Sequence, residues 1–145
     1  MISVDFMRTC DVDEVFKVEC ECFSAPWSKK SFLGELQNEH TVYLVAKDGE
    51  KIIGYAGVWC VAGDADITNI AVLSDFRRKG AGKKLLERLI FEAEKRGSEN
   101  IRLEVRKSNE AAISLYEKFG FLKVYIREKY YDNKEDALIL EKKIN

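Results

Sequence analysis

The chain has 145 residues, of which 46% are hydrophobic and 34% charged, and its 24 basic and 25 acidic side chains leave a formal net charge of −1. This length predicts a single domain over residues 1–145 that builds a core without disulfides or metal. The balanced charge does not indicate direct nucleic-acid binding. No apolar run approaches the ~20 residues of a membrane span. The N-terminal segment has no signal-peptide pattern, so we expect a cytoplasmic protein.

The first third of the chain predicts a strand followed by two helices. Alternating residues over 2–7 indicate a half-buried strand. Asp11 and Glu14 have the spacing of a capping box at a helix start. Apolar residues at helical spacing follow them: Val12, Val15, Phe16, Cys20 and Phe23. The segment 24–28 interrupts this helix, and Ser28 is placed to cap a second, short one.

The rest of the chain alternates strands with helices. Strands are predicted over 43–47, 51–61, 65–72, 101–105, 121–129 and 136–143. Helices are predicted over 80–96 and 109–119, each ended by a glycine. Turn residues at 48–50 and 132–134 separate the neighbouring strands. This order predicts an α/β domain built around one sheet.

The four cysteines and the single histidine lack the spacing of zinc ligands, so no metal site is predicted. We expect reduced, mostly packed thiols at Cys10, Cys20, Cys22 and Cys60. His40 precedes an apolar strand and is expected in a loop, in preference to a nucleophilic Cys–His pair.

The junction between strand 65–72 and helix 80–96 is the most informative segment. Basic residues at 77–79 and 83 surround Gly80 and Gly82. The first N–H groups of a helix have no internal partners, and glycine lets a phosphate approach them closely. The segment therefore predicts a pyrophosphate-binding loop, with a solvated basic helix start as the alternative. It is neither a P-loop nor a dinucleotide fingerprint, because the required residues are absent at 77, 84 and 85.

The segment Arg77-Arg78-Lys79-Gly80-Ala81-Gly82 resembles the Arg/Gln-x-x-Gly-x-Gly/Ala signature of the GCN5-related N-acetyltransferase (GNAT) family. The stretches 103–121 and 130–140, and the early Pro26-Trp27-Ser28 loop, resemble the branch that acetylates the N-terminal alanine of ribosomal proteins. The resemblance implies the α/β GNAT fold. In that fold a single mixed, mostly antiparallel, twisted sheet of about seven strands is flanked by four helices in the order βααβββαβαββ.

The resemblance also implies acetyl-CoA as co-substrate and no metal. The loop N–H groups would hold the pyrophosphate, and the strand 69–72 would pair through its backbone with the pantetheine arm. Asn109 and Tyr116 would face the cofactor from the next helix. The implied cofactor-binding residues are Ile70, Ala71, Val72, Arg77, Arg78, Lys79, Gly80, Ala81, Gly82, Lys83, Asn109 and Tyr116.

Glu104 is the candidate general base, acting directly or through one water. A carboxylate in a mainly apolar strand is unexpected unless it is paired, exposed or used, and the corresponding family position carries this role. The alternative is a solvent-facing glutamate or an ion pair with Arg102 or Arg106.

Tyr116 is the candidate general acid. Its place on an apolar helix face favours a core role by pattern alone, but the matching family tyrosine protonates the departing coenzyme A thiolate. For the oxyanion we expect the Val72 backbone N–H, freed by a strand splay or a bulge near Ala71.

The resemblance implies a protein N-terminus as the acceptor, most specifically the N-terminal alanine of the small-subunit ribosomal protein S18. An α-amine has a pKa of about 7.7–8.0 against about 10.4 for lysine, so a modest base suffices. Candidate acceptor-binding residues are Phe23, Pro26, Trp27, Tyr130 and Tyr131, with ordinary packing as the alternative. Adjacent residues of a strand point to opposite faces, so at most one of the two tyrosines should face a given pocket.

Other functions stay open at this point. The acceptor could be a lysine or a small-molecule amine, or the chain could be a non-catalytic acyl-CoA-binding module. RNA binding through the basic loop is the least favoured reading, and the oligomeric state is not predicted.

Overall fold

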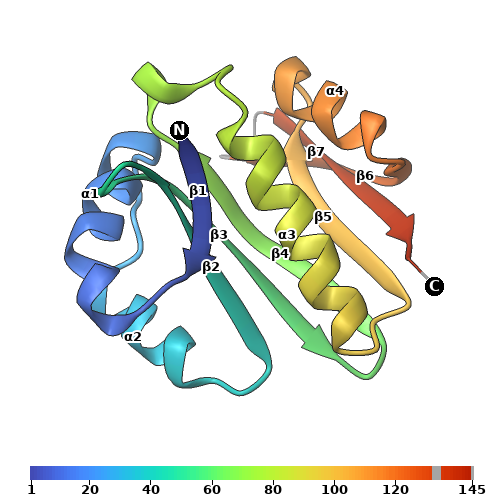
Figure 1. Cartoon of the computed structure of the whole chain (residues 1–145). Coiled ribbons are helices and arrows are strands. Elements are labelled where there is room, and N and C mark those ends of the chain that lie inside the picture. Colours follow the sequence, from blue (N-terminus) through green and yellow to red (C-terminus); the bar gives the residue numbers. More distant parts are fainter. Residues whose placement is uncertain (132–134, 145) are drawn as a thin grey trace.

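The computed structural model describes residues 1–131 and 135–144 (Figure 1). Its helices and strands are β1 Ile2–Phe6, α1 Val12–Cys22, α2 Lys29–Gln37, β2 Thr41–Asp48, β3 Lys51–Val61, β4 Asp64–Val72, α3 Ala81–Lys95, β5 Asn100–Arg106, α4 Glu110–Lys118, β6 Leu122–Tyr131 and β7 Glu135–Lys143. Short 3-10 turns occupy Thr9–Asp11 and Ser74–Phe76. The predicted order βααβββαβαββ is confirmed.

All seven strands form one sheet in the order β1-β2-β3-β4-β5-β7-β6. Every neighbouring pair is antiparallel except β4 and β5, which run parallel because α3 connects them. The mixed, mostly antiparallel sheet is therefore confirmed. The predicted turn at 132–134 lies outside the described residues, but Tyr131 and Glu135 pair on either side of it.

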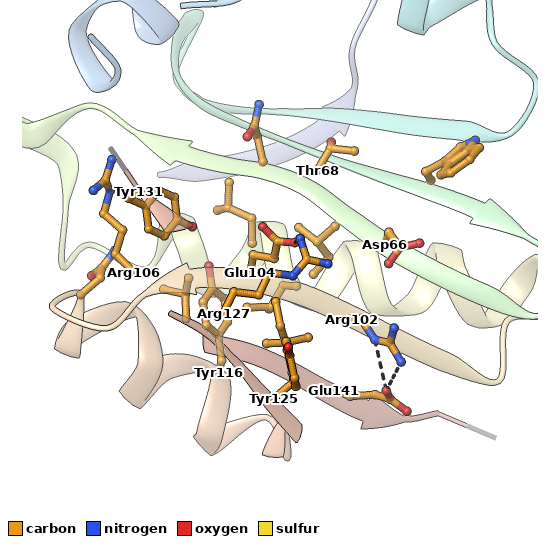
Figure 2. A pocket seen from close by; sticks show the side chains of 18 of the residues that line it. Asp66, Thr68, Arg102, Glu104, Arg106, Tyr116, Tyr125, Arg127, Tyr131 and Glu141 are labelled. Carbon is orange, nitrogen blue, oxygen red and sulfur yellow. Dashed lines mark hydrogen bonds and ion pairs between the residues drawn. The ribbon is translucent and has the colours of Figure 1, made fainter. Parts of the chain in front are cut away.

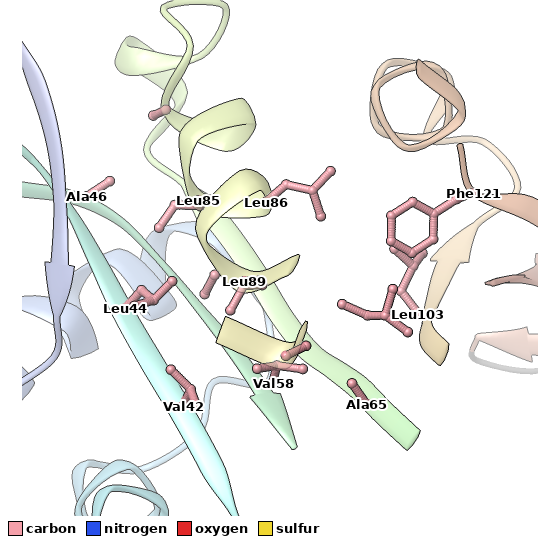
Figure 3. Packing of buried hydrophobic residues seen from close by; sticks show 14 of the residues in the cluster. Val42, Leu44, Ala46, Val58, Ala65, Leu85, Leu86, Leu89, Leu103 and Phe121 are labelled. Atoms are coloured by element: carbon pink, nitrogen blue, oxygen red, sulfur yellow. The ribbon is translucent and has the colours of Figure 1, made fainter. Parts of the chain in front are cut away.

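Helix α3 covers one face of the sheet and contributes the centre of the larger core. Its leucines at 85, 86 and 89 are fully buried against residues of β2, β3 and β5, among them Leu44 and Leu103 (Figure 3). Burying each such side chain contributes ~1.5–3 kcal/mol. Residues of α4 pack at the rim of this cluster, on the side of β5.

Helices α1 and α2 cover the other face with a smaller, more aromatic cluster. Phe32 of α2 lies edge-on to Tyr55 of β3, with ring centroids 5.3 Å apart. The predicted stripe of α1 is only partly right: Val12 and Val15 are buried, but Cys20 is exposed. Val18 and Glu19 take the remaining core positions of this helix.

Asp11 is the N-cap residue of α1, as predicted, but the predicted capping box is wrong. The Asp11 carboxylate accepts from the Arg8 backbone N–H at 2.9 Å, so it stabilises the preceding 3-10 turn. The Glu14 carboxylate accepts from the backbone N–H of Ile52 in β3 at 3.1 Å. Glu14 thus accepts from an N–H group in β3, far away in the sequence, and not from the N–H at the helix start that the local pattern predicted.

The cysteines are free, but the expectation that they are mostly packed is wrong for two of them. Cys10 and Cys20 are exposed, whereas Cys22 and Cys60 are partly buried. His40 lies in the exposed turn before β2, as predicted. In the described parts of the chain, no helix combines the length and apolarity needed to cross a membrane.

Candidate active site

The sheet opens between β4 and β5. These strands pair only over residues 64–66 and 100–102, although β4 continues to Val72 and β5 to Arg106. Beyond Asp66 and Arg102 their facing edges separate, and a cavity of about 990 Å³ lies at the opening (Figure 2). The splay predicted from the sequence is therefore present, starting earlier along β4 than Ala71.

A bulge on β4 decides which side chains enter the cavity. Val58 of β3 pairs with Ile67 and Gly57 pairs with Asn69, so Thr68 is an extra residue on β4. In a regular strand residues 67 and 69 would share a face. Ile67 packs on the α3 cluster, but Asn69 is turned to the opposite face, where its Nδ2 donates to Tyr55. The bulge expected near Ala71 lies at Thr68 instead.

The backbone of Val72 faces the gap between the strands. The N–H of Leu73 donates to the carbonyl of Ile53 in β3 at 2.8 Å. Because successive N–H groups of a strand point to opposite edges, the Val72 N–H points away from β3. The carbonyl of Val72 accepts from Arg77 Nε at 3.1 Å on that same side. The splay, not a local bulge, thus leaves the Val72 N–H directed at the opening.

The loop before α3 has the conformation of an anion-binding turn. Arg78 and Gly80 have positive φ angles of 64° and 87°, and Gly80 is the N-cap of the helix. The first N–H that bonds back into the helix is that of Lys84, which donates to the Gly80 carbonyl at 3.0 Å. The N–H groups of residues 81–83 precede this bond, so they are directed out of the helix end.

The cations of this loop divide into two groups. Arg77 bonds to the Val72 carbonyl, and Lys79 lies over the Phe76 ring with its Nζ 5.3 Å from the centroid. Arg78 and Lys83 are exposed and form no ion pair with any residue of 1–131 or 135–144. The positive charges of Arg78 and Lys83 are therefore available to an anion at the start of α3.

Glu104 lies on the cavity side of β5. Its neighbours Leu103 and Val105 are buried in the α3 cluster, and strand alternation turns Glu104 to the opposite face. Its Oε1 lies 3.1 Å from Nη1 of Arg127 on β6. The two side chains are 34% and 48% exposed, and such pairs are worth ~0–1 kcal/mol. A cationic substrate can therefore displace Arg127 from Glu104 with little loss of free energy.

The ion-pair partners considered for Glu104 from the sequence are engaged elsewhere. Arg102 Nη2 lies 2.6 Å from Oε2 of Glu141, and Arg106 Nη1 lies 3.2 Å from Oε1 of Glu135 (the first pair is drawn in Figure 2). Each pair joins β5 to β7, its antiparallel neighbour. The glutamate is paired, but with an arginine from the edge strand.

Tyr116 of α4 lines the same cavity from below β5 (Figure 2). Its ring packs against Phe121, with centroids 5.9 Å apart. Burial, reinforced by neighbouring Tyr131, raises the pKa of Tyr116 to about 12. The phenol is therefore a protonated donor at neutral pH. Asn109 also lines the cavity, and its Oδ1 caps α4 by accepting from the Ala112 N–H at 3.2 Å.

The aromatic residues predicted for acceptor binding divide in two. Phe23, Trp27 and Tyr131 line the cavity, whereas Pro26 and Tyr130 do not. Tyr131 is covered by the Arg106 guanidinium, 4.1 Å from the ring centroid. Its neighbour Tyr130 is 49% exposed and lies outside the cavity lining, so only one of the two faces the pocket, as predicted. The predicted reason is wrong: the positive φ of Lys129 makes the strand irregular here, and the two rings lie edge-on to each other with centroids 5.2 Å apart.

Sequence reasoning missed a polar chain on the α1/α2 face. Glu19 accepts from the Tyr55 hydroxyl at 2.5 Å, and Tyr55 accepts from Asn69 Nδ2 at 2.9 Å. Arg127 was missed as well. Glu19 follows Val12 and Val15 at core spacing, and Asn69 interrupts an apolar strand, so both positions carry a signal that could have identified them.

The two partly buried cysteines are poorly suited to act as nucleophiles. Burial raises the pKa of the Cys22 and Cys60 thiols, which opposes thiolate formation. His40 is exposed, and its Nε2 lies 3.6 Å from the Glu39 carboxylate.

Comparison with known proteins supports an acetyltransferase. The model of the acetyltransferase (GNAT) family matches residues 12–121. A Bacillus subtilis (strain 168) protein, provisionally named a ribosomal protein bS18-alanine N-acetyltransferase, is 41% identical over 145 residues, covering 99% of this chain and 96% of that protein. The ribosomal protein bS18-alanine N-acetyltransferase of Escherichia coli (strain K12) is 38% identical over 143 residues, covering 97% and 96%.

Solved structures agree with these sequence matches. The crystal structure of the ribosomal-protein-S18-alanine N-acetyltransferase from Escherichia coli matches 100% of this chain and 95% of that one, with a TM-score of 0.91 and 38% identity. The segment matched to the family includes both splayed strands and the basic loop between β4 and α3. The chain therefore belongs to the acetyltransferase (GNAT) family.

Proposed function

We propose that this protein transfers the acetyl group of acetyl-CoA to the α-amine of the N-terminal alanine of ribosomal protein bS18, in the cytoplasm. The observation that carries the proposal is the splay of β4 and β5, which opens one cavity to both Glu104 and Tyr116. The names of the relatives at 38% and 41% identity supply the acceptor.

The residues beside the splay fit acetyl-CoA. The outward N–H groups of residues 81–83, with Arg78 and Lys83, suit a pyrophosphate. The gap-side backbone groups of Ile70 and Val72 suit the amides of a pantetheine arm, which would extend β4 as an added strand. Tyr116 and Asn109 line the cavity from α4.

The reaction forms an N–C bond and breaks the C–S bond of the thioester. The neutral amine attacks the carbonyl carbon and loses a proton to Glu104. The Val72 N–H stabilises the oxyanion, and the Tyr116 hydroxyl protonates the departing thiolate. The high pKa of Tyr116 keeps its proton in place until the thiolate forms.

An α-amine suits this site better than a lysine. It is about two to three pKa units more acidic as an ammonium ion, so a single partly exposed carboxylate can accept its proton. Phe23, Trp27 and Tyr131 provide apolar walls for the first residues of a peptide.

Coenzyme A release should be measured with acetyl-CoA and two matched peptides. One peptide begins with the free N-terminal alanine of bS18, and the other is N-blocked and carries an internal lysine. We expect turnover with the first peptide alone. Turnover with the blocked peptide alone would move the acceptor to a side chain and overturn the proposal.

A further inference from the structure

A buried carboxylate without a basic partner lies beside the candidate site. Glu19 is 2% exposed and forms no ion pair with any described residue. Its Oε2 accepts from the backbone N–H of Trp27 at 2.9 Å, and its Oε1 accepts from the Tyr55 hydroxyl. Burying a charge is unfavourable unless it is paired and hydrogen-bonded, and here the carboxylate is hydrogen-bonded without a charged partner.

The hydrogen-bond chain has a direction. A carboxylate only accepts, so the Tyr55 hydroxyl gives its proton to Glu19. Burial, and then Glu19 itself, raises the pKa of Tyr55, which keeps the phenol protonated. The hydroxyl oxygen is left to accept, and it accepts from Asn69 Nδ2. The carboxylate thereby sets which end of the Asn69 amide faces Tyr55.

The other end of that amide opens into the cavity. Asn69 lines the cavity, and its Oδ1 has no hydrogen-bond partner in residues 1–131 or 135–144. No side-chain oxygen or nitrogen of those residues is both buried and unpaired, so this oxygen is open to solvent. The bulge at Thr68 turns Asn69 to the face that Glu104 shares.

We propose that Asn69 Oδ1 accepts a hydrogen bond from the α-amino group of the acceptor, and that Glu19 and Tyr55 are positioning residues that hold its amide in that orientation. The inference rests on the proposed function, since it needs an amine acceptor. An amino group offers N–H donors whether it is charged or neutral. A fixed carbonyl oxygen can therefore hold it throughout deprotonation by Glu104.

The test measures steady-state kinetics with acetyl-CoA and the free N-terminal alanine peptide. Asn69→Ala should raise the KM for the peptide about 10- to 100-fold, because a hydrogen bond to a charged group is lost. The KM for acetyl-CoA should change less than about twofold. Tyr55→Phe should raise the peptide KM in the same way, since the amide can then rotate.

The matched control is Tyr43→Phe. It removes another buried phenol hydroxyl on the same face, one that is hydrogen-bonded to Thr68 Oγ1 at 3.0 Å and, among the described residues, not to Asn69. It should leave the peptide KM near that of the wild type. If Tyr55→Phe unfolds the protein, Glu19→Gln is tested in its place. An amide of the same size can donate to Tyr55, so the Tyr55 hydroxyl no longer has to donate to residue 19 and can turn toward Asn69.

Two comparisons separate positioning from a general structural effect. In the Asn69→Ala background, adding Tyr55→Phe should raise the peptide KM no further. The backbone N–H of the peptide's second residue is the competing donor to Asn69. The loss should therefore persist when that residue is proline, which has no backbone N–H. Additive effects, an equal effect of Tyr43→Phe, or a loss that vanishes with the proline peptide would each overturn the inference. If the wild type fails on every free α-amine, the proposed function fails instead.

Discussion

A glutamate is buried on each face of the sheet, and the two carboxylates have different hydrogen-bond donors. In α3, Glu92 is 1% exposed and accepts from Arg88 Nε at 2.9 Å and Arg96 Nη1 at 2.6 Å. On the other face, Glu19 is 2% exposed, and its donors among the described residues are the neutral N–H of Trp27 and the hydroxyl of Tyr55. The first cluster lies within α3 and its C-cap residue, whereas the second joins α1, the following loop, β3 and β4.

This difference in donors predicts which changes affect stability and which affect function. Arginines one turn away on either side neutralise Glu92 wherever that helix forms, and neither they nor Glu92 line the cavity. The donors to Glu19 come together only in the folded sheet, and their chain ends at the cavity. We therefore expect changes around Glu92 to alter unfolding, and changes on the cavity face to alter catalysis.

The largest expected effect is on the cavity face. Glu104→Gln should lower kcat/KM at pH 7 about 10²- to 10⁴-fold, because the proposed general base is lost. The unfolding midpoint should stay close to that of the wild type, since the exposed pair with Arg127 contributes little. Glu141→Gln is the control, as it removes another cavity carboxylate that pairs with Arg102. Equal losses in the two variants, or an unchanged rate for Glu104→Gln over pH 6–9, would contradict the assignment.

The converse change is made around Glu92. The double variant Arg88→Ala, Arg96→Ala should lower the free energy of unfolding by about 3–5 kcal/mol, because it leaves a buried carboxylate unpaired. Turnover per folded molecule should be retained, which urea unfolding and a rate assay together would show. Adding Glu92→Leu should recover part of the stability, since an apolar side chain needs no partner. A large fall in kcat/KM without a loss of stability would break the comparison.

Tyr116→Phe should lower kcat about 10²-fold and leave the KM for acetyl-CoA nearly unchanged, because only the hydroxyl of the proposed proton donor is removed. Since the pKa of Tyr116 is raised to about 12, the wild-type rate should show no decline from this group below about pH 11. A variant that binds acetyl-CoA poorly but turns over normally would reduce the role of Tyr116 to packing.

The smallest expected effect concerns pH and stability. Burial alone would raise the pKa of Glu92, but hydrogen bonds from Arg96 and Arg88 outweigh it and hold the pKa below its ordinary value of 4.5. A depressed folded-state pKa stabilises the protein above the unfolded value and loses that contribution as pH falls through the folded value. Glu92→Gln should therefore flatten the fall of unfolding free energy below about pH 4.5. An unchanged slope would show that Glu92 is not the group responsible.

Much of the fold follows from local patterns. The helix 80–96 was predicted within a residue or two, because its apolar spacing and its flanking glycines act within a few turns. The basic loop was recognised for the same reason, since its residues are neighbours in the chain. The candidate base and acid were found by their positions within a family resemblance, and the structure brings Glu104 and Tyr116 to one cavity.

Other features depend on partners that only the folded chain supplies. Glu14 leaves the predicted capping box for a donor in β3, and Glu19 fills a core position because Tyr55 and Trp27 reach it. Arg127 pairs with Glu104 because β7 places the edge strand β6 near β5.

The sequence by itself determined the order of the elements, the apolar face of α3 and the composition of the basic loop, since these depend on spacing along the chain. The tertiary structure alone decided where β4 leaves β5, and it placed the extra residue at Thr68. Strand register depends on cross-strand pairing, and a shift of one residue reverses the faces of all that follow. That is why Asn69 faces the cavity and not the core beneath α3.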